Sequence, residues 1–495
     1  MQVFDVEKCF DALWLQECIN VVYDAGLKND KLNLLFLENV HAQVAIKTSN
    51  GKSKRIGIDN IIMQGSVWGS LLCTTSMDKL GQMFYENEEL LYWYKGNVAV
   101  PPLCMVDDVL AVQTCSQASV KVNAVINQFI ELKKLTLSDK KCSKIHVGKS
   151  SDSCPDLKIH DNSMKNSTQE KYLGDQLVNT AKIKETIEDR KSKGYGIVSE
   201  ILAILNEIPL GIYKLEMGLK LRQAMLVNGI LFNSEGWHGV TEEDIRTLEK
   251  VDEALLRSML QCHAKVPLEF LYLETGSIFI RHILSSRRIK FLRTILKRED
   301  EELTKRIYRE QERNPTTGDF VELVKDDFAT KEMKYDENFI TMSSGPIFKH
   351  TVKTQVEKAA LRDFLKKQRS HSKIKSIRYD KLQPQPYLKS KLFSNKEVIL
   401  LAALRSHTVR GVRCNFKNMY KDNTQCPLLC SPLSPQQDSQ EHLLVCSKLN
   451  MNNVIAASKI SYDDIYGDVS AQKTVVSVFT DLLNRRNKLM EEQTN

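Results

Sequence analysis

Two adjacent aspartates, Asp107 and Asp108, interrupt the apolar stretch from residue 101 to residue 112. Strand-forming residues on both sides of the pair predict a β-hairpin whose tight turn presents both carboxylates at the edge of a sheet. Two like charges held together are costly unless a cation binds between them. Mg²⁺ binds carboxylate oxygens and leaves coordination positions for phosphate, so the pair is a candidate magnesium site. A solvated turn is the alternative.

A third carboxylate stands at the start of the chain. Residues 3–11 indicate a strand that ends near Asp5 and passes into a helix. Two metal ions that bridge the phosphates of a nucleotide need ligands from both sides, and Asp5 and Asp107 on neighbouring strands would supply them. The ring of Phe10 would then lie in the turn below the sugar, where it could sense a 2′-hydroxyl.

Three further segments carry groups suited to nucleotide chemistry. Gln64 would supply hydrogen bonds, and Gly65 would let its backbone approach a base pair or sugar closely. Lys141 could protonate a leaving pyrophosphate. A short strand and turn are expected at Tyr172, Leu173 and Gly174. Each of these segments, taken alone, is also compatible with a plain loop.

The C-terminal part of the chain contains a second kind of metal pattern. It has the form Cys-x3-Cys-x11-His-x3-Cys and consists of Cys426, Cys430, His442 and Cys446. This spacing falls within the range of structural zinc sites, although three residues rather than two separate the first cysteines. A short helix over residues 440–448, N-capped by Asp438, would place the last two ligands on one face. Four ligands fill a tetrahedron and leave no position for catalysis. Free cysteines beside a surface histidine are the alternative.

The elements that must position these residues change in character along the chain. Positions 1–180 indicate mixed α/β structure, with a hairpin over residues 43–58 that turns at Asn50-Gly51. The remainder is helical in pattern. Residues 242–261, for example, carry apolar residues on one face and follow Thr241, a good N-cap. The expected fold class is therefore α+β.

Two segments concentrate basic residues. A helix over residues 285–298 would place an apolar stripe opposite a basic back. Residues 361–378 contain seven basic residues and one acidic residue, a density that favours contacts with nucleic-acid phosphates. The candidates for these contacts are Lys366, Lys367, Arg369, Lys373, Lys375 and Arg378. For both segments a solvated face is the alternative.

The length and amino-acid composition of the chain limit the classes of protein to which it can belong. The 495 residues give room for about two to four domains, and 70 basic against 62 acidic residues give a formal charge of +8. Such mild basicity permits a nucleic-acid partner without requiring one. No run of 18 apolar residues occurs, so no membrane span is expected. The scattered cysteines favour reduced thiols and an intracellular location, either nucleus or cytoplasm. The oligomeric state stays open.

The order of the motifs over positions 1–180 resembles the palm of a reverse transcriptase, of the type found in non-LTR retrotransposons. By this resemblance, Asp5 is the first catalytic aspartate of motif A and Phe10 is its steric-gate aromatic. Gln64-Gly65 matches motif B. The family commonly has proline where this chain has Ser70.

The same resemblance covers the later motifs. Val106-Asp107-Asp108 matches the box of motif C, with Met105 where an aromatic residue usually stands. Lys141 matches the lysine of motif D, and Tyr172-Leu173-Gly174 matches the primer grip.

This resemblance implies an RNA-directed DNA polymerase that takes an RNA template, a DNA primer and deoxynucleoside triphosphates. Asp5 and Asp107 would be the main ligands of two catalytic Mg²⁺ ions, and Asp108 would support them. The metal-bound 3′-hydroxyl of the primer would attack the α-phosphate of the nucleotide. Catalysis would then rest on positioning and on charge neutralisation.

The resemblance also implies an order of domains. The expected domains are a palm over 1–180 (an antiparallel sheet with flanking helices), an all-helical thumb over 181–330, a basic helical connector over 331–425, a zinc knuckle over 426–446 with one structural Zn²⁺, and a helical tail over 447–495. Only four residues precede Asp5, so we expect the fingers region to be missing and the chain to be a truncated form. The missing fingers region and Ser70 affect whether the chain is active, but not the family that it resembles.

Three hypotheses about function follow. The chain is a polymerase whose catalytic residues persist, or a catalytically inactive remnant that binds nucleic acid through residues 361–378 and the knuckle, or a purely structural interaction module. A second acidic pair, in Tyr462-Asp463-Asp464, has no upstream aspartate at the matching spacing. We expect it to be a helix start or a turn.

Overall fold

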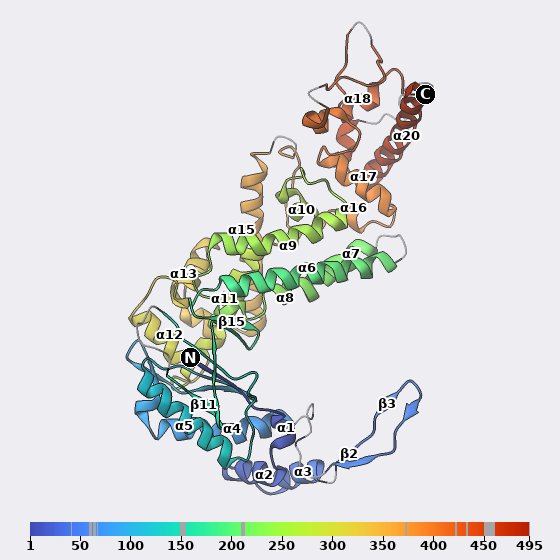
Figure 1. The fold of residues 1–495 in the computed structure, drawn as a ribbon. Helices are drawn as coiled ribbons and strands as arrows, with labels where there is room; N and C mark the ends of the chain where they lie inside the picture. Colours follow the sequence, from blue (N-terminus) through green and yellow to red (C-terminus); the bar gives the residue numbers. More distant parts are fainter. Residues whose placement is uncertain are drawn as a thin grey trace. The chain divides into compact units, whose positions relative to one another are not determined.

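The chain folds into two compact units, each built from two segments (Figure 1). Unit 1 comprises Met1–Thr186 and Arg298–Thr316, and unit 2 comprises Ile187–Lys297 and Thr317–Asn495. The computed structural model describes residues 1–40, 42–58, 62, 66, 68–148, 155–208, 213–371, 374–420, 423–431, 434–449 and 461–494. Unit 1 combines a sheet with helices and unit 2 is helical, so the expected α+β class is confirmed.

A five-stranded sheet forms the centre of unit 1, in the order β13-β10-β1-β9-β8. Its strands are β1 (Gln2–Asp5), β8 (Leu103–Met105), β9 (Asp108–Ala111), β10 (Ser143–Ile145) and β13 (Lys165–Ser167). Strand β1 pairs antiparallel with both β9 and β10, and β8 pairs antiparallel with β9. Strands β10 and β13 are parallel, so the expectation of a wholly antiparallel sheet is wrong at this edge. The physical reason is the long connection over residues 146–164, which returns the chain to the same end of the sheet.

Helices pack against this sheet through one hydrophobic core. They are α1 (Cys9–Ala12), α2 (Leu15–Asp24), α3 (Asp30–Asn39), α4 (Gly69–Tyr85), α5 (Ser116–Leu132) and the 3₁₀ turn η1 (Glu88–Leu90), whereas α12 (Leu303–Arg313) lies outside this core. Phe4 of β1, Phe84 of α4 and Phe129 of α5 are fully buried in the core. The apolar faces of these helices therefore pack against the sheet, which includes the strand that carries Asp5.

Several two-stranded hairpins surround the sheet. Their strands are β2 (Ala42–Val44) with β5 (Ile56–Ile58), β3 (Lys47–Thr48) with β4 (Gly51–Lys52), β6 (Tyr92–Tyr94) with β7 (Val98–Val100), β11 (Lys158–Ile159) with β12 (Asn162–Ser163), and β14 (Gln169–Tyr172) with β15 (Asp175–Val178). The hairpin predicted over residues 43–58 is confirmed, but its turn is Ser49-Asn50 rather than Asn50-Gly51, because Gly51 pairs with Thr48 and follows the turn with a φ of 124°. Within unit 1, this hairpin extends beyond α3 (Figure 1).

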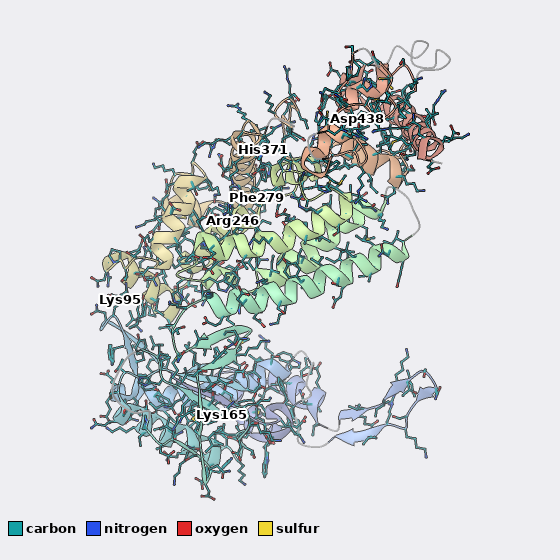
Figure 2. The ribbon with its side chains drawn as sticks, turned by 45° about the horizontal axis from the view of Figure 1, so that its top comes forward. Lys95, Lys165, Arg246, Phe279, His371 and Asp438 are labelled. Carbon is teal, nitrogen blue, oxygen red and sulfur yellow. The ribbon has the colours of Figure 1, made fainter. Side chains whose placement is uncertain are left out.

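The segment Arg298–Thr316 completes unit 1, although it is far from the sheet in sequence. Its helix α12 contacts β7, and the side chain of Asn97 donates a hydrogen bond to Glu310 at 2.8 Å. Lys95, labelled in Figure 2, donates to the hydroxyl of Thr316 at 2.8 Å. The amide of Gln311 donates to the Tyr94 hydroxyl at 3.1 Å. These bonds tie the β6–β7 hairpin to a part of the chain that is distant from it in sequence.

Unit 2 is built from helices. They are α6 (Lys184–Glu207, which begins at the end of unit 1), α7 (Tyr213–Leu221), a π-helical stretch η2 (Arg222–Val227), α8 (Asn228–Ile230), η3 (Ser234–Gly236), α9 (Glu242–Leu260), α10 (Leu268–Thr275), α11 (Ile280–Leu296), α13 (Phe320–Thr330), α14 (Glu337–Met342), α15 (Gly345–Gln368), α16 (Pro386–Lys389), α17 (Asn395–Arg405), η4 (Arg413–Tyr420), α18 (Gln440–Val445), η5 (Tyr462–Tyr466) and α20 (Val469–Thr494). Thr241 caps α9 as expected, because its side chain accepts from the amide of Asp244 in a capping box.

The core of unit 2 contains buried aromatic rings and buried ion pairs. Phe279, labelled in Figure 2, packs against Tyr272 and Phe364 with ring centroids 4.2 and 4.3 Å away. Beside these rings, Arg222 forms a bidentate pair with Asp252, with both N–O distances at 2.6 Å. No described helix is long and apolar enough to cross a membrane.

The basic helix expected over residues 285–298 is only partly as predicted. Ile289 and Leu292 of α11 are buried, as the apolar stripe requires. Arg288, however, is also buried and forms a bidentate pair with Asp327 of α13 at 2.6 and 2.9 Å. This guanidinium therefore belongs to the core, because a buried acid on the next helix neutralises it.

Candidate functional site

The sheet of unit 1 brings the three candidate aspartates to one end of two paired strands. Asp5 is the last residue of β1, and its register partner on β9 is Asp108. Side chains of directly opposed residues lie on the same face of a sheet, with Cβ atoms about 4.5–5.5 Å apart. Asp107 precedes β9 in the turn, and its carbonyl accepts the amide of Val6 at 3.0 Å. Asp107 therefore lies in the turn and not, as was expected, on the strand that adjoins β1, and Asp108 is the residue directly opposite Asp5.

The turn that carries Asp107 is strained. Met105 of β8 pairs with Asp108 of β9, so only Val106 and Asp107 lie between the strands. Such a two-residue turn requires a positive φ, and Val106 has a φ of 60°. A β-branched residue in this region costs on the order of 1–3 kcal/mol. The backbone therefore holds Asp107 in place at the expense of local stability.

Lys141 lies at the same end of the sheet. Its ammonium nitrogen is 3.1 Å from a carboxylate oxygen of Asp5. The hydrogen bond and charge of Asp5, with smaller contributions from Asp107 and Asp108, raise the pKa of Lys141. Burial raises the pKa of Asp108, and the charges of Asp107 and Asp5 raise it further. These mutual effects place the four groups in one electrostatic cluster.

Backbone hydrogen bonds explain how Lys141 reaches Asp5. The amide of Ser138 donates to the carbonyl of Asp5 at 2.9 Å, and the amide of Lys141 donates to the carbonyl of Ser138 at 3.1 Å. The amide of Asp5 in turn donates to the sulfur of Cys142 at 3.3 Å. The segment 138–142 therefore folds against the end of β1. The role of Cys142 was not predicted from the sequence, because nothing in the residues around it indicates a contact with Asp5, which is far away in the chain.

The residues expected to contact the nucleotide are only partly described. Phe10 is half-buried in α1, and its carbonyl accepts the amide of Ile62 at 3.2 Å. Gln64 and Gly65 lie outside the described residues. The bond to Ile62 nevertheless fixes the chain two residues before Gln64 beside the helix that carries Phe10.

The segment expected as a primer grip is a second tight hairpin. Leu173 and Gly174 form the turn between β14 and β15, with φ values of 47° and 94°. The hydroxyl of Tyr172 donates to the carbonyl of Leu103 on β8 at 3.0 Å. Burial, with smaller effects of Cys104 and Asp108, raises the pKa of Tyr172 to about 12, so the hydroxyl keeps its proton. The hairpin is thereby attached to the strand that leads into the Asp107 turn.

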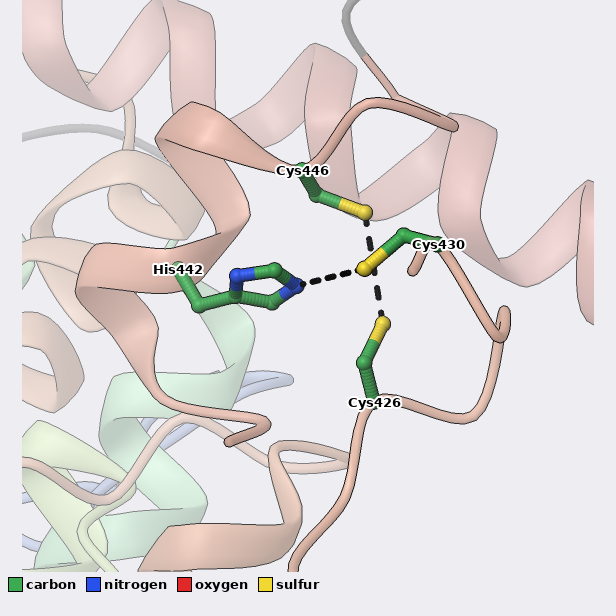
Figure 3. A group of neighbouring side chains, drawn as sticks. All are labelled: Cys426, Cys430, His442 and Cys446. Carbon is green, nitrogen blue, oxygen red and sulfur yellow. Dashed lines mark hydrogen bonds between the residues drawn. The ribbon is translucent and has the colours of Figure 1, made fainter. Parts of the chain in front are cut away.

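The four residues of the C-terminal Cys/His pattern form a compact cluster (Figure 3). It consists of Cys426, Cys430, His442 and Cys446, whose ligand atoms all lie within 4.8 Å of one another. The sulfurs of Cys426 and Cys446 are 4.0 Å apart, and the sulfur of Cys430 is 3.4 Å from Nε2 of His442. Zinc bonds of about 2.3 Å to sulfur and about 2.0–2.1 Å to nitrogen, at tetrahedral angles, would give separations of about 3.8 and about 3.5 Å. The donor set and its spacing therefore fit Zn²⁺.

Local elements hold the cluster in shape. A hairpin-like pairing places the amide of Cys426 on the carbonyl of Gln436 at 2.8 Å. Helix α18 carries His442 and ends immediately before Cys446. The hydrogen bond between Cys446 and Cys426 lowers the pKa of the Cys426 thiol and raises the pKa of the Cys446 thiol, so the two sulfurs share a proton. In the described part of the chain, no other group of three or more His, Cys, Asp or Glu ligand atoms meets at this spacing.

Asp438 has a different role from the one expected. The side chain of Ser439, not that of Asp438, caps α18, and the helix ends at Val445 rather than near residue 448. Asp438, labelled in Figure 2, is fully buried and accepts from the amide of Arg413 and the guanidinium of Arg486, both at 2.7 Å. The carboxylate therefore connects the cluster to α20 as part of a buried ion pair.

The basic stretch 361–378 is not one helix. Helix α15 ends at Gln368, and the residues beyond it form turns. The side chains that remain exposed are Lys366, Lys367, Arg369, Lys375 and Arg378, whereas Lys373 lies outside the described residues. The amide of Gln368 explains the break, since it donates to the carbonyls of Ile374 and Ile377 and folds the chain back.

The second acidic pair is structural, as expected. Ser461 and Asp464 form a capping box at the start of the 3₁₀ helix η5, and Asp463 is exposed. No sheet strand adjoins this pair among the described residues, so it differs in context from Asp107-Asp108.

Comparison with known proteins agrees with the geometry of unit 1. Residues 1–177 match the family model described as reverse transcriptase (RNA-dependent DNA polymerase). The matched segment contains β1, the Asp107 turn, Lys141 and the Tyr172 hairpin. No curated protein matches the chain. The resemblance to a reverse transcriptase domain is therefore confirmed for residues 1–177, and the match does not include the Cys/His cluster.

Proposed function

We propose that unit 1 is the palm of an RNA-directed DNA polymerase of non-LTR retrotransposon origin, with Asp5, Asp107 and Asp108 at its catalytic centre. The observation that supports this most is the meeting of Asp5 with the Asp107-Asp108 turn on adjacent antiparallel strands. That meeting lies inside the segment that matches the reverse transcriptase family.

Asp5 and Asp107 would hold the catalytic metal, with Asp108 in support. Their carboxylate oxygens are ligands that Mg²⁺ prefers, and the ammonium of Lys141 offsets only part of their negative charge. Bound Mg²⁺ would supply neutralisation of the phosphate charge and activation of the primer 3′-hydroxyl. The strained turn at Val106 would keep the carboxylate of Asp107 at the sheet edge, where a nucleotide can reach it.

Lys141 would hold the proton that the leaving pyrophosphate needs. Its raised pKa keeps it protonated at neutral pH, and its side chain is 68% exposed, so it can move from Asp5 to a phosphate. Phe10 would lie below the sugar of the nucleotide, while Gln64 and Gly65 would contact the base pair. The Tyr172-Leu173-Gly174 hairpin would position the primer end relative to Asp107, through the bond from Tyr172 to β8.

Residues 181–330 would form the thumb, although Arg298–Thr316 within this range belong to unit 1, and the rest of unit 2 would supply the parts that follow. The exposed cations at the end of α15 and beyond it, such as Lys366 and Arg378, would contact nucleic-acid phosphates. The Cys/His cluster would bind one Zn²⁺ as a structural ion, because four protein ligands leave no open position.

Primer extension on an RNA template, with Mg²⁺ and deoxynucleotides, tests the assignment of the catalytic centre. We expect the wild-type protein to extend the primer and Asp107→Asn to reduce the rate by at least about 100–1000-fold, the typical loss when one group that stabilises transition-state charge is removed. Asp463→Asn is the matched control, since it removes one carboxylate from the exposed Tyr-Asp-Asp sequence in unit 2.

Three outcomes are distinguishable. Loss of extension in Asp107→Asn alone supports the catalytic centre. Equal rates in both variants would contradict it. Salt-sensitive binding of the RNA–DNA substrate by a wild-type protein that never extends the primer would instead favour an inactive remnant that binds nucleic acid.

A further inference from the structure

The hairpin arm, defined here as residues 42–58, carries an unusual concentration of uncompensated charge. It contains four basic residues and no acidic residue, namely Lys47, Lys52, Lys54 and Arg55. Residues 43–57 are all exposed, and none of the four cations forms an ion pair within the part of the chain that the structure describes. The arm extends away from the helices of unit 1 (Figure 1).

The register of the arm places two of these cations against each other. Lys47 of β3 pairs directly with Lys52 of β4. Like charges at directly opposed positions destabilise a strand pair, because the side chains are held within a few ångströms. Such a pair is stabilised when an anion binds over both ammonium groups. This pairing is the observation that points to an anionic partner rather than to a merely solvated turn.

The arm also has two chemically different faces. Val44 pairs with Ile56, and alternation along the strand puts Ile46 on the same face. Lys47 follows Ile46 and Arg55 precedes Ile56, so alternation puts these cations, with Lys52, on the opposite face. Val44, Ile46 and Ile56 are 36%, 58% and 58% exposed. One face is thus aliphatic and the other basic.

The arm consists of two separate two-stranded ladders joined by residues that are not in strands. Residues 45–46 separate the pairs on the first strand, and residues 53–55 separate them on the return strand. The return strand therefore has one extra residue.

We propose that the hairpin arm binds the phosphate backbone of the primer–template duplex through Lys47, Lys52 and Arg55. The proposal rests on the proposed function, since it takes its partner from the polymerase assignment. The duplex is chosen as the partner because of charge complementarity, since its backbone presents closely spaced phosphates to a basic face. The contact is independent of sequence, as expected for phosphate contacts.

The salt dependence of binding measures this contact. The full chain is titrated against a fluorescent RNA–DNA duplex between about 50 and about 200 mM salt, where log K falls with a slope of about −0.9 for each neutralised phosphate of a duplex. We expect Lys47→Gln with Lys52→Gln to reduce the steepness of this slope by about 2. Lys31→Gln with Lys79→Gln is the control, because both lysines are exposed in unit 1 and the charge removed is the same.

The outcomes separate this proposal from the polymerase assignment. An unchanged slope in the Lys47/Lys52 variant, or an equal change in the control, would show that the proposal is wrong. A reduced slope only on single-stranded RNA would reject the duplex as partner. The titration requires no catalysis, so a slope effect in the Lys47/Lys52 variant of a protein whose wild-type form does not extend the primer would contradict the polymerase assignment alone. The arm would instead be assigned to protein contact if the Lys47/Lys52 variant left the salt slope unchanged and if the protein self-associated in a way that Ile46→Ser abolishes.

Discussion

The carboxylate site of unit 1 and the Cys/His cluster of unit 2 would hold a metal ion in opposite ways. In the cluster, four ligand atoms lie within 4.8 Å, and Cys426 and Cys446 are buried. In the carboxylate site, Asp5, Asp107 and Asp108 are all half-exposed at a sheet edge, and an exposed lysine lies against one of them. A closed ligand set suits an ion that stays, whereas an open set suits one that must exchange contacts with a substrate.

The largest effect is expected when one ligand is removed from the closed Cys/His cluster. Cys446→Ser should lower bound zinc from about one ion per chain to nearly none, and should lower the thermal stability of unit 2, because folding energy comes from all four ligands together. Zinc content and calorimetry measure the two effects. Cys414→Ser is the control, since Cys414 lies in the same region but outside the cluster. Loss of zinc in both variants, or in neither, would contradict the assignment.

The next effect concerns the lysine of the open site. Lys141→Arg keeps the positive charge beside Asp5 but cannot release a proton, because the guanidinium pKa is above 12. We expect kcat to fall by about 100–10,000-fold, the typical contribution of general acid catalysis, with little change in KM. Steady-state primer extension measures both constants. A variant with normal kcat would show that Lys141 acts only through its charge, and Lys140→Arg, one residue away, serves as the control.

A smaller effect appears in the pH dependence of metal binding at the open site. Burial, Asp107 and Asp5 raise the pKa of Asp108, so this carboxyl takes up a proton at a higher pH than an ordinary aspartate. Affinity for Mn²⁺ should therefore fall, by up to about tenfold per pH unit, once the pH drops below that raised pKa. The charge of Lys141 lowers the pKa of Asp108, so Lys141→Met should move the decline to higher pH. Mn²⁺ titrations at several pH values measure it, and a shift to lower pH would contradict the electrostatic coupling.

The smallest effect is expected when backbone strain is relieved in one turn of each unit. Leu173 in the hairpin of unit 1 and Leu429 between the first two cysteines of unit 2 both have a φ of 47° and exposed side chains. Asparagine tolerates this conformation better, so Leu173→Asn and Leu429→Asn should each stabilise the protein by about 1 kcal/mol. Thermal unfolding measures the change. A decrease in both midpoints would show that the leucine side chains contribute contacts that outweigh the strain.

Local patterns of the sequence were sufficient for part of this structure. The hairpin that turns next to Gly51, the cap at Thr241 and the hairpin that presents Asp107 all depend on residues within a few positions of one another. The spacing of the four Cys/His ligands was equally informative, because the ligands lie close together in sequence and metal geometry constrains them.

The failures concern partners that are distant in sequence. Nothing near Arg288 indicates that Asp327 will bury it, and nothing near Asp438 indicates Arg486. The parallel pairing of β13 and the end of α15 at Gln368 likewise depend on where the chain returns. In the carboxylate site, the contact of Lys141 with Asp5 joins two distant motifs, and the order of motifs alone does not specify it.

The return of Arg298–Thr316 to unit 1 means that the polypeptide passes between the two units three times. A protein cut shortly after β15 would lose α12, and with it the acceptors that Asn97 and Lys95 use. Such a fragment would expose the β6–β7 hairpin to solvent. Expression of unit 1 by itself should therefore include this distant helix, joined through a designed linker, if it is to fold.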